Sequence, residues 1–133
     1  MSTGEYRLPI ATDIDVTRAS MQARRCALAQ GFDTITAAML VTTVSELGTN
    51  ILKYAVRGEL VIQPIERVGK KGLLIRATDQ GPGIVDVDTA MQDHHSTGGT
   101  LGLGLPGVKR MMDEFEIRSE PKRGTTITVK KWI

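Results

Sequence analysis

The chain has 133 residues, of which 41% are hydrophobic and 24% are charged, a composition that predicts one globular domain and argues against a disordered chain. The 17 basic and 15 acidic side chains leave a net charge of +2, and only 4% of the residues are aromatic, so a nucleic-acid partner is not expected. The one cysteine, Cys26, permits no internal disulfide and fits a reducing compartment.

The first part of the chain is predicted to be mainly helical. A short strand is expected over residues 6–10. A helix follows, because Thr12 or Asp13 can cap its N-terminus and Gly31 is a typical helix stop.

A second, longer helix is predicted from Asp33, which can cap it, to about Val56. Gly58 then ends the helical part of the chain. The apolar positions of this helix recur at helical spacing and predict one buried face, formed by Leu40, Val44, Leu47, Ile51 and Ala55.

Strands dominate the next segment. Residues 59–68 and 73–78 predict a hairpin whose turn lies at residues 69–72. Pro64 within the first of these strands predicts an edge position or a bulge, because proline cannot donate to a central ladder.

The last part begins with a glycine-rich loop at 79–107, which is long enough to indicate function or disorder. A helix over about 105–113 follows, and residues 115–119 and 126–132 form a second hairpin across 121–124.

These elements amount to about three helices and five strands without alternating βαβ units. The pattern predicts an α+β class, with a largely antiparallel sheet and helices on one face, in one domain over residues 1–133. No apolar run approaches the roughly 18 residues of a membrane span, and the N-terminus does not resemble a signal peptide. We therefore expect a cytoplasmic protein without a membrane partner.

Three polar side chains follow one stripe of the second predicted helix, beside its apolar face. At about 100° per residue, Glu46, Asn50 and Lys53 line up along the edge of that face. Such a stripe could hold a metal and an anion, but taken alone it equally fits an ordinary amphipathic helix with a solvated side.

Two glycine-rich motifs lie in the long loop. Asp79 follows a predicted strand, and Gly81 and Gly83 after it would allow close backbone approach, although a tight turn explains them equally well. Residues 96–107 end at a predicted helix N-terminus, where free N–H groups suit a phosphate. A dinucleotide-binding reading of G-x-G-x-x-G at 102–107 fails, because no strand precedes it and no βαβ unit surrounds it.

A fourth motif, at 123–126, opens the last strand. Together, the order and spacing of Glu46, Asp79, Gly102 and Gly124 resemble the N, G1, G2 and G3 boxes of the GHKL, or Bergerat-fold, ATP-binding superfamily. The resemblance covers nearly the whole chain and implies a two-layer α/β sandwich with a mixed, mostly antiparallel sheet. The stretch GLGLPGVKRMMDEFEI that begins at Gly102 is similar to RsbT-type kinases of stressosome partner-switching modules.

The resemblance implies roles for the residues at the nucleotide base and the metal. Asp79 matches the aspartate that accepts a hydrogen bond from the adenine amino group, and Thr125 matches a threonine that helps to bind adenine. Gly81 and Gly83 would leave room for the base. Asn50 matches the asparagine that ligates Mg²⁺.

Further residues are implied to act on the phosphates and in catalysis. Lys53 is placed to touch a phosphate, and Glu46 matches the candidate general base that accepts a proton from an attacking serine hydroxyl. A short lid is implied to bind the phosphates through Thr100, Leu101, Gly102, Leu103 and Gly104.

The function implied is that of an ATP- and Mg²⁺-dependent protein serine/threonine kinase. The expected substrate is a STAS-domain protein, RsbS-like or RsbR-like, and the released kinase would activate an RsbU-type phosphatase. One alternative is an anti-sigma factor with the same kinase chemistry that sequesters a sigma factor. A module that binds nucleotide without turnover is a second alternative, against which the intact Glu46 and Asn50 argue.

Overall fold

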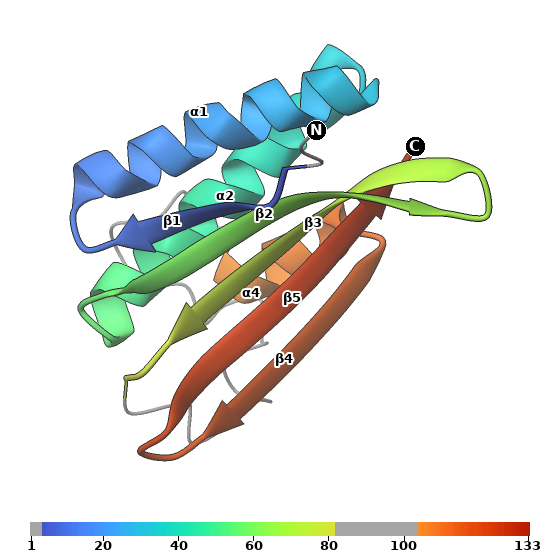
Figure 1. Ribbon diagram of the computed structural model, residues 1–133. Coiled ribbons are helices and arrows are strands. Elements are labelled where there is room, and N and C mark those ends of the chain that lie inside the picture. Colours follow the sequence, from blue (N-terminus) through green and yellow to red (C-terminus); the bar gives the residue numbers. More distant parts are fainter. Residues whose placement is uncertain (1–3, 82–103) are drawn as a thin grey trace.

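The computed structural model describes residues 4–81 and 104–133 (Figure 1). Those residues form three helices and five strands, and the predicted α+β class is confirmed. In chain order the elements are β1 (Tyr6–Ile10), α1 (Asp13–Gln30), α2 (Thr34–Tyr54), β2 (Gly58–Arg67), β3 (Lys70–Asp79), α4 (Gly104–Met111), β4 (Glu114–Glu120) and β5 (Gly124–Trp132).

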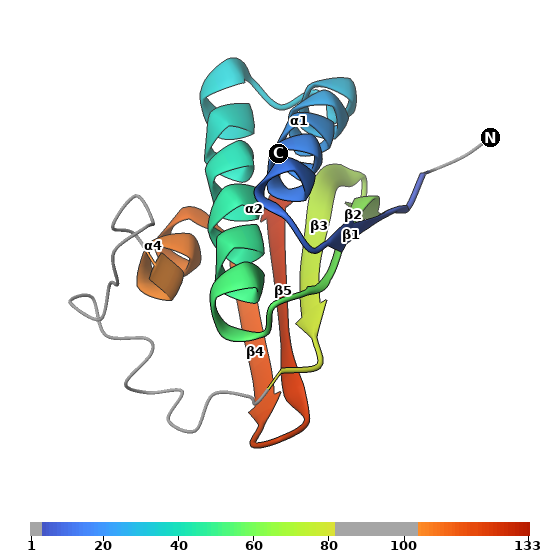
Figure 2. The same ribbon diagram turned by 90° about the vertical axis from the view of Figure 1, so that its left-hand side faces the viewer.

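The strands form a single sheet in the order β1-β2-β3-β5-β4. Each neighbouring pair is antiparallel, so the sheet is antiparallel throughout the described residues rather than mixed. Figure 2 shows α1, α2 and α4 gathered on one side of the sheet, and none of the described residues forms a helix on the other side. The molecule therefore has two layers, as the resemblance implies.

Local signals set the ends of α1. The hydroxyl of Thr12 accepts a hydrogen bond from the N–H of Asp15, and the Asp15 carboxylate accepts one in return from the N–H of Thr12. A hydrogen bond from the N–H of Ala11, together with these contacts, keeps the pKa of Asp15 below its usual value. Gly31 ends the helix with a φ of 105°, as predicted.

Helix α2 is the central helix of the molecule. Asp33 caps it as predicted, but it ends at Tyr54 instead of about Val56, because Val56 adopts a φ of 73° that a right-handed helix cannot continue. In the described residues it is the one helix long and apolar enough to cross a membrane by composition. Its packing against α1, the sheet and α4 identifies it here as a core helix.

The β2–β3 hairpin differs from the prediction in its turn. The turn is the pair Val68–Gly69, with φ angles of 50° and 79°, and not residues 69–72. Pro64 does lie at an open edge, because β1 pairs with β2 only as far as Ile62.

The core lies between the helices and the sheet. Alternate residues of each strand face the helices, and Cys26 is a small buried residue on α1. The largest side chains that are fully buried are Ile10, Leu40, Val44, Leu47, Ile51, Leu60, Ile62, Leu73, Ile75, Val108, Ile127 and Val129.

Candidate functional site

The three residues of the predicted polar stripe all lie on α2. They differ in burial, because Glu46 is 5% exposed, Asn50 is half-buried and Lys53 is exposed. A carboxylate as buried as that of Glu46 is rare unless it has a partner or a function. The ammonium of Lys53 lies 5.8 Å from the centre of the Tyr54 ring.

One partner of Glu46 is the beginning of α4. The N–H of Gly104 donates to Glu46 Oε1 at 3.2 Å, and Figure 2 shows α4 beside α2 on the same face of the sheet. The N-terminal end of a helix favours negative charge. At the other end of α4, the carbonyl of Met111 accepts a hydrogen bond from Lys131 of β5 at 2.9 Å. The helix that contacts Glu46 is therefore fixed to the sheet.

Asp79 and Thr125 face each other across the last pair of the β3–β5 ladder. Asp79 Oδ1 accepts hydrogen bonds from the N–H of Gly81 at 2.9 Å and from the N–H of Thr125 at 3.3 Å. Both contacts use one carboxylate oxygen. Among the residues that the structure describes, no donor contacts the second oxygen.

Glycines let the backbone approach closely around Asp79. A Cβ atom at Gly81 would lie 2.6 Å from the Cβ of Ala55, so the chain after β3 contacts the end of α2 directly. A Cβ atom at Gly124 would collide with the carbonyl oxygen of Asp79, and Gly124 also has a φ of 105°. Asp79 is thereby held between the end of α2 and the beginning of β5.

A depression of about 300 Å³ opens at this end of the sheet, and it wraps around the edge, because its lining includes Asp79, Ser119 and Thr125 as well as residues of the opposite strand parity, Thr78, Arg118 and Thr126. Thr125 is 6% exposed, and its hydroxyl lies 2.9 Å from that of Ser119 on β4. The sequence did not single out Ser119. Strand alternation could have identified it, because Ile117 and Ser119 face the same side of β4 and the pair Ser119–Thr125 is in register.

Asn50 is the predicted metal ligand, and its amide oxygen fits Mg²⁺. Within residues 4–81 and 104–133, no group of three or more His, Cys, Asp or Glu side chains could hold a metal ion by itself. Mg²⁺ commonly binds through one protein oxygen together with substrate phosphates and waters, so a single amide ligand is chemically sufficient.

Several predicted site residues lie outside the described residues, namely Gly83, Thr100, Leu101, Gly102 and Leu103. Gly104 is described, and it is the first residue of α4. The sequence assigned it to phosphate binding and missed its contact with Glu46, which joins residues 58 positions apart.

A family model described as a histidine kinase-like ATPase domain matches residues 10–131. The chain is 47% identical over 124 residues to the serine/threonine-protein kinase RsbT of Bacillus subtilis, with 93% of each chain covered. It is 33% identical over 96 residues to an anti-sigma F factor of Caldanaerobacter subterraneus subsp. tengcongensis, covering 69% of this chain and 67% of that protein.

Two solved structures have the same fold. One belongs to the SiaB–SiaC complex of Pseudomonas aeruginosa, with a TM-score of 0.60, 14% identity and coverage of 98% of this chain and 89% of the other. The other is the histidine kinase domain of a blue-light-activated kinase of Erythrobacter litoralis, with a TM-score of 0.56, 18% identity and coverage of 90% and 59%.

Proposed function

The chain belongs to the histidine kinase-like ATPase domain family and is a serine/threonine-protein kinase of the RsbT type, and from this premise we propose that it phosphorylates a STAS-domain protein. The proposed substrate is RsbS-like or RsbR-like. Once released from its substrate, the kinase binds and activates an RsbU-type phosphatase, so phosphorylation exchanges its partners. Residues 1–133 act as one domain in this proposal, in the cytoplasm, where ATP is available.

The observation that carries the proposal is the buried carboxylate of Glu46, held by the N–H of Gly104 one helical turn before Asn50. A carboxylate held in this way can accept the proton of a serine or threonine hydroxyl as general base. The hydroxyl oxygen forms a bond to the γ-phosphorus of ATP, the bond from that phosphorus to the β–γ bridging oxygen breaks, and ADP leaves.

The base of ATP is assigned to the end of the β3–β5 ladder. Asp79 has a carboxylate oxygen that the described residues leave open, and an adenine amino group can donate to it. Thr125 supplies a hydroxyl beside it. Gly81 and Gly83 leave space for the ring, as the resemblance implies.

The phosphates are assigned to the N-terminal end of α4, where Gly104 begins the helix, and to Lys53. The preceding residues of the resemblance complete this assignment, namely Thr100, Leu101, Gly102 and Leu103. Asn50 would hold Mg²⁺, which when bound neutralises charge on the phosphates.

Phosphoryl transfer tests the proposal directly. The kinase is incubated with γ-labelled ATP and Mg²⁺ together with purified RsbS-like and RsbR-like proteins, and the label on each protein is measured. We expect label on a serine or threonine of at least one STAS protein, and loss of that label with Glu46→Gln. Absence of transfer to both proteins by a kinase that binds ATP would overturn the assigned substrate class.

The similarity to anti-sigma F factors favours a second candidate, in which the kinase also sequesters a sigma factor. Binding of the purified kinase to an RsbU-type phosphatase and to sigma factors from the same cell distinguishes the two. We expect ATP-independent binding to the phosphatase. A stable complex with a sigma factor alone would favour the second candidate.

A further inference from the structure

Three oxygen atoms form a short chain at the base-binding end of the sheet. Ser119 on β4 is half-buried, and its hydroxyl oxygen lies 2.9 Å from the hydroxyl oxygen of Thr125. The same Ser119 oxygen lies 3.3 Å from the carbonyl oxygen of Gly124. Thr125 is in turn held by its backbone N–H, which donates to Asp79.

The Gly124 carbonyl determines the direction of the hydrogen bonds made by the hydroxyls of Ser119 and Thr125. A carbonyl oxygen only accepts, so the Ser119–Gly124 contact requires the Ser119 proton to point to Gly124. Ser119 has one hydroxyl proton, and its contact with Thr125 is then satisfied only if Thr125 is the donor. In this arrangement both contacts are hydrogen bonds, and the Thr125 oxygen keeps only lone pairs for a ligand.

We propose that Ser119 is a positioning residue that sets base specificity by accepting the hydrogen bond that the Thr125 hydroxyl donates. Thr125 and the Asp79 carboxylate then both present acceptors to the base and no donor. The inference rests on the proposed function, because it assumes that Asp79 and Thr125 bind the base. A base-binding site that offers only hydrogen-bond acceptors favours a purine with an amino group at position 6. It disfavours a purine with an oxygen at that position.

The matched probes are ATP and inosine triphosphate, which differ in having a 6-amino or a 6-oxo group. Loss of one hydrogen bond to a charged acceptor corresponds to roughly a 10- to 100-fold loss of affinity, and we expect a preference of at least that size for ATP. Without Ser119, the Thr125 hydroxyl is free to rotate and donate to the 6-oxo group. The preference should then fall by about 10-fold, mainly through better binding of inosine triphosphate.

The experiment is calorimetric titration of both nucleotides, with Mg²⁺, into the wild type, Ser119→Ala, Ser119→Thr and Thr128→Ala. Ser119→Thr keeps the hydroxyl and should keep the ATP preference. Thr128→Ala is the control, because Thr128 lies on the same strand as Thr125, faces the opposite side of the sheet and does not line the depression. Melting temperatures show which variants are folded, and Ser119→Cys replaces Ser119→Ala if that variant fails to fold.

Each result has one interpretation. A lower ATP preference in Ser119→Ala that Ser119→Thr restores supports the proposal. An equal loss of affinity for both nucleotides, or an unchanged preference, overturns it and leaves Ser119 a structural residue. A wild type that binds the two nucleotides equally also overturns it. A wild type that binds neither nucleotide contradicts the proposed function itself.

Discussion

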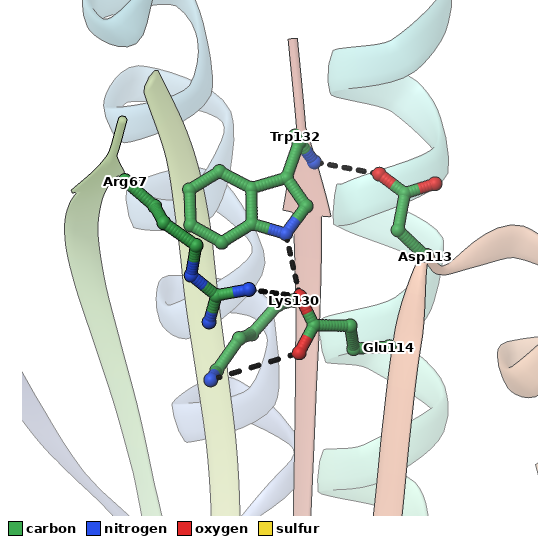
Figure 3. Close-up of polar contacts among 5 residues, drawn as sticks. All are labelled: Arg67, Asp113, Glu114, Lys130 and Trp132. Atoms are coloured by element: carbon green, nitrogen blue, oxygen red, sulfur yellow. Dashed lines mark hydrogen bonds and ion pairs between the residues drawn. The ribbon is translucent and has the colours of Figure 1, made fainter. Parts of the chain in front are cut away.

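A carboxylate lies near each end of the β3–β5 ladder, and the two differ in their hydrogen-bond donors. The end at Gly72–Trp132 is called the closed end, and the end at Asp79–Thr125 is called the open end. At the end where Gly72 pairs with Trp132, side-chain donors contact the carboxylate of Glu114, which is partly exposed (Figure 3). The indole N–H of Trp132 donates to it at 2.7 Å, Arg67 lies at 3.2 Å and Lys130 at 3.8 Å. The guanidinium of Arg67 also lies 4.8 Å from the centre of the Trp132 ring.

At the other end, eight residue pairs along the ladder from Gly72–Trp132 to Asp79–Thr125, one carboxylate oxygen of Asp79 accepts both backbone hydrogen bonds. Its second oxygen meets no donor among the described residues. Both carboxylates lie near strand ends, so position in the sheet does not distinguish them. The donors do: three side chains contact Glu114, whereas among the described residues two backbone N–H groups contact a single oxygen of Asp79.

Glu46→Gln should give the largest effect of the variants considered. Glutamine keeps the size of the side chain and its Oε1 can still accept from Gly104, so folding and ATP binding should persist. The proton acceptor is lost, and transfer to the STAS substrate should fall by about 10²–10⁴-fold, as is typical for general-base catalysis. Single-turnover transfer with labelled ATP measures the rate.

Glu46→Ala is the comparison variant, because it also removes the acceptor for Gly104 and should loosen α4. Transfer by Glu46→Gln at nearly the wild-type rate would show that Glu46 is not the base. Loss of ATP binding in Glu46→Gln would instead assign Glu46 a structural role.

Asp79→Asn should abolish measurable ATP binding at ordinary titration concentrations with the fold intact. The asparagine oxygen can still accept from Gly81 and Thr125, which places its NH₂ group where the open carboxylate oxygen was. Losing a hydrogen bond to a charged acceptor costs about 1.5–3 kcal/mol of binding free energy. The cost is larger here, because the asparagine NH₂ group and the adenine amino group are both donors and would face each other. Glu114→Gln at the closed end is the control and should bind ATP normally. Unchanged affinity in a folded Asp79→Asn variant would remove Asp79 from the site.

Local signals in the sequence were sufficient for much of the fold. Thr12, Gly31 and Asp33 set helix ends by contacts within a few residues, and the apolar face of α2 follows from its period. The turn after β2 was misplaced because Gly72 looks like a turn residue. It is in fact a strand residue, and a Cβ there would lie 2.6 Å from the Trp132 ring, a contact between residues 60 positions apart by number.

The candidate site was predicted from the spacing of its motifs, but its contacts were not. The stripe of Glu46, Asn50 and Lys53 is a property of one helix and could be read from the sequence. The hydrogen bond from Gly104 to Glu46 depends on how α4 lies against α2, which no local pattern encodes. Ser119 lay within reach of strand alternation and was missed because serine in a strand carries no distinct signal.

Trp132→Phe tests the closed end and should lower stability without changing ATP affinity. The hydrogen bond from Trp132 is the main cause that lowers the pKa of Glu114, with the charges of Arg67 and Lys130 adding to it. A lowered pKa stabilises the fold above the ordinary carboxylate value, and this contribution is lost as the pH falls through the folded-state pKa. The difference in melting temperature between wild type and variant should therefore be larger at pH 7 than at about pH 3. A constant difference would show that only packing is lost.

The smallest effects are expected from two strained valines, one near each end of the sheet. Val56 follows α2 with a φ of 73° and Val68 forms the β2–β3 turn with a φ of 50°, and both are exposed. A left-handed backbone costs a β-branched residue about 1–2 kcal/mol, and glycine avoids that cost but loses about 0.5–1 kcal/mol of chain entropy on folding. Val56→Gly and Val68→Gly should each stabilise the protein by about 0.5–1 kcal/mol in urea unfolding.

Val68→Gly should leave ATP affinity unchanged, because its turn is distant from Asp79 along the hairpin. Val56 adjoins Ala55, which contacts Gly81, so a change of ATP affinity in Val56→Gly alone would show that strain at the end of α2 helps to position the open end. Equal ATP affinities in both variants would confine the strain to stability, and a loss of stability in either would contradict the strain itself.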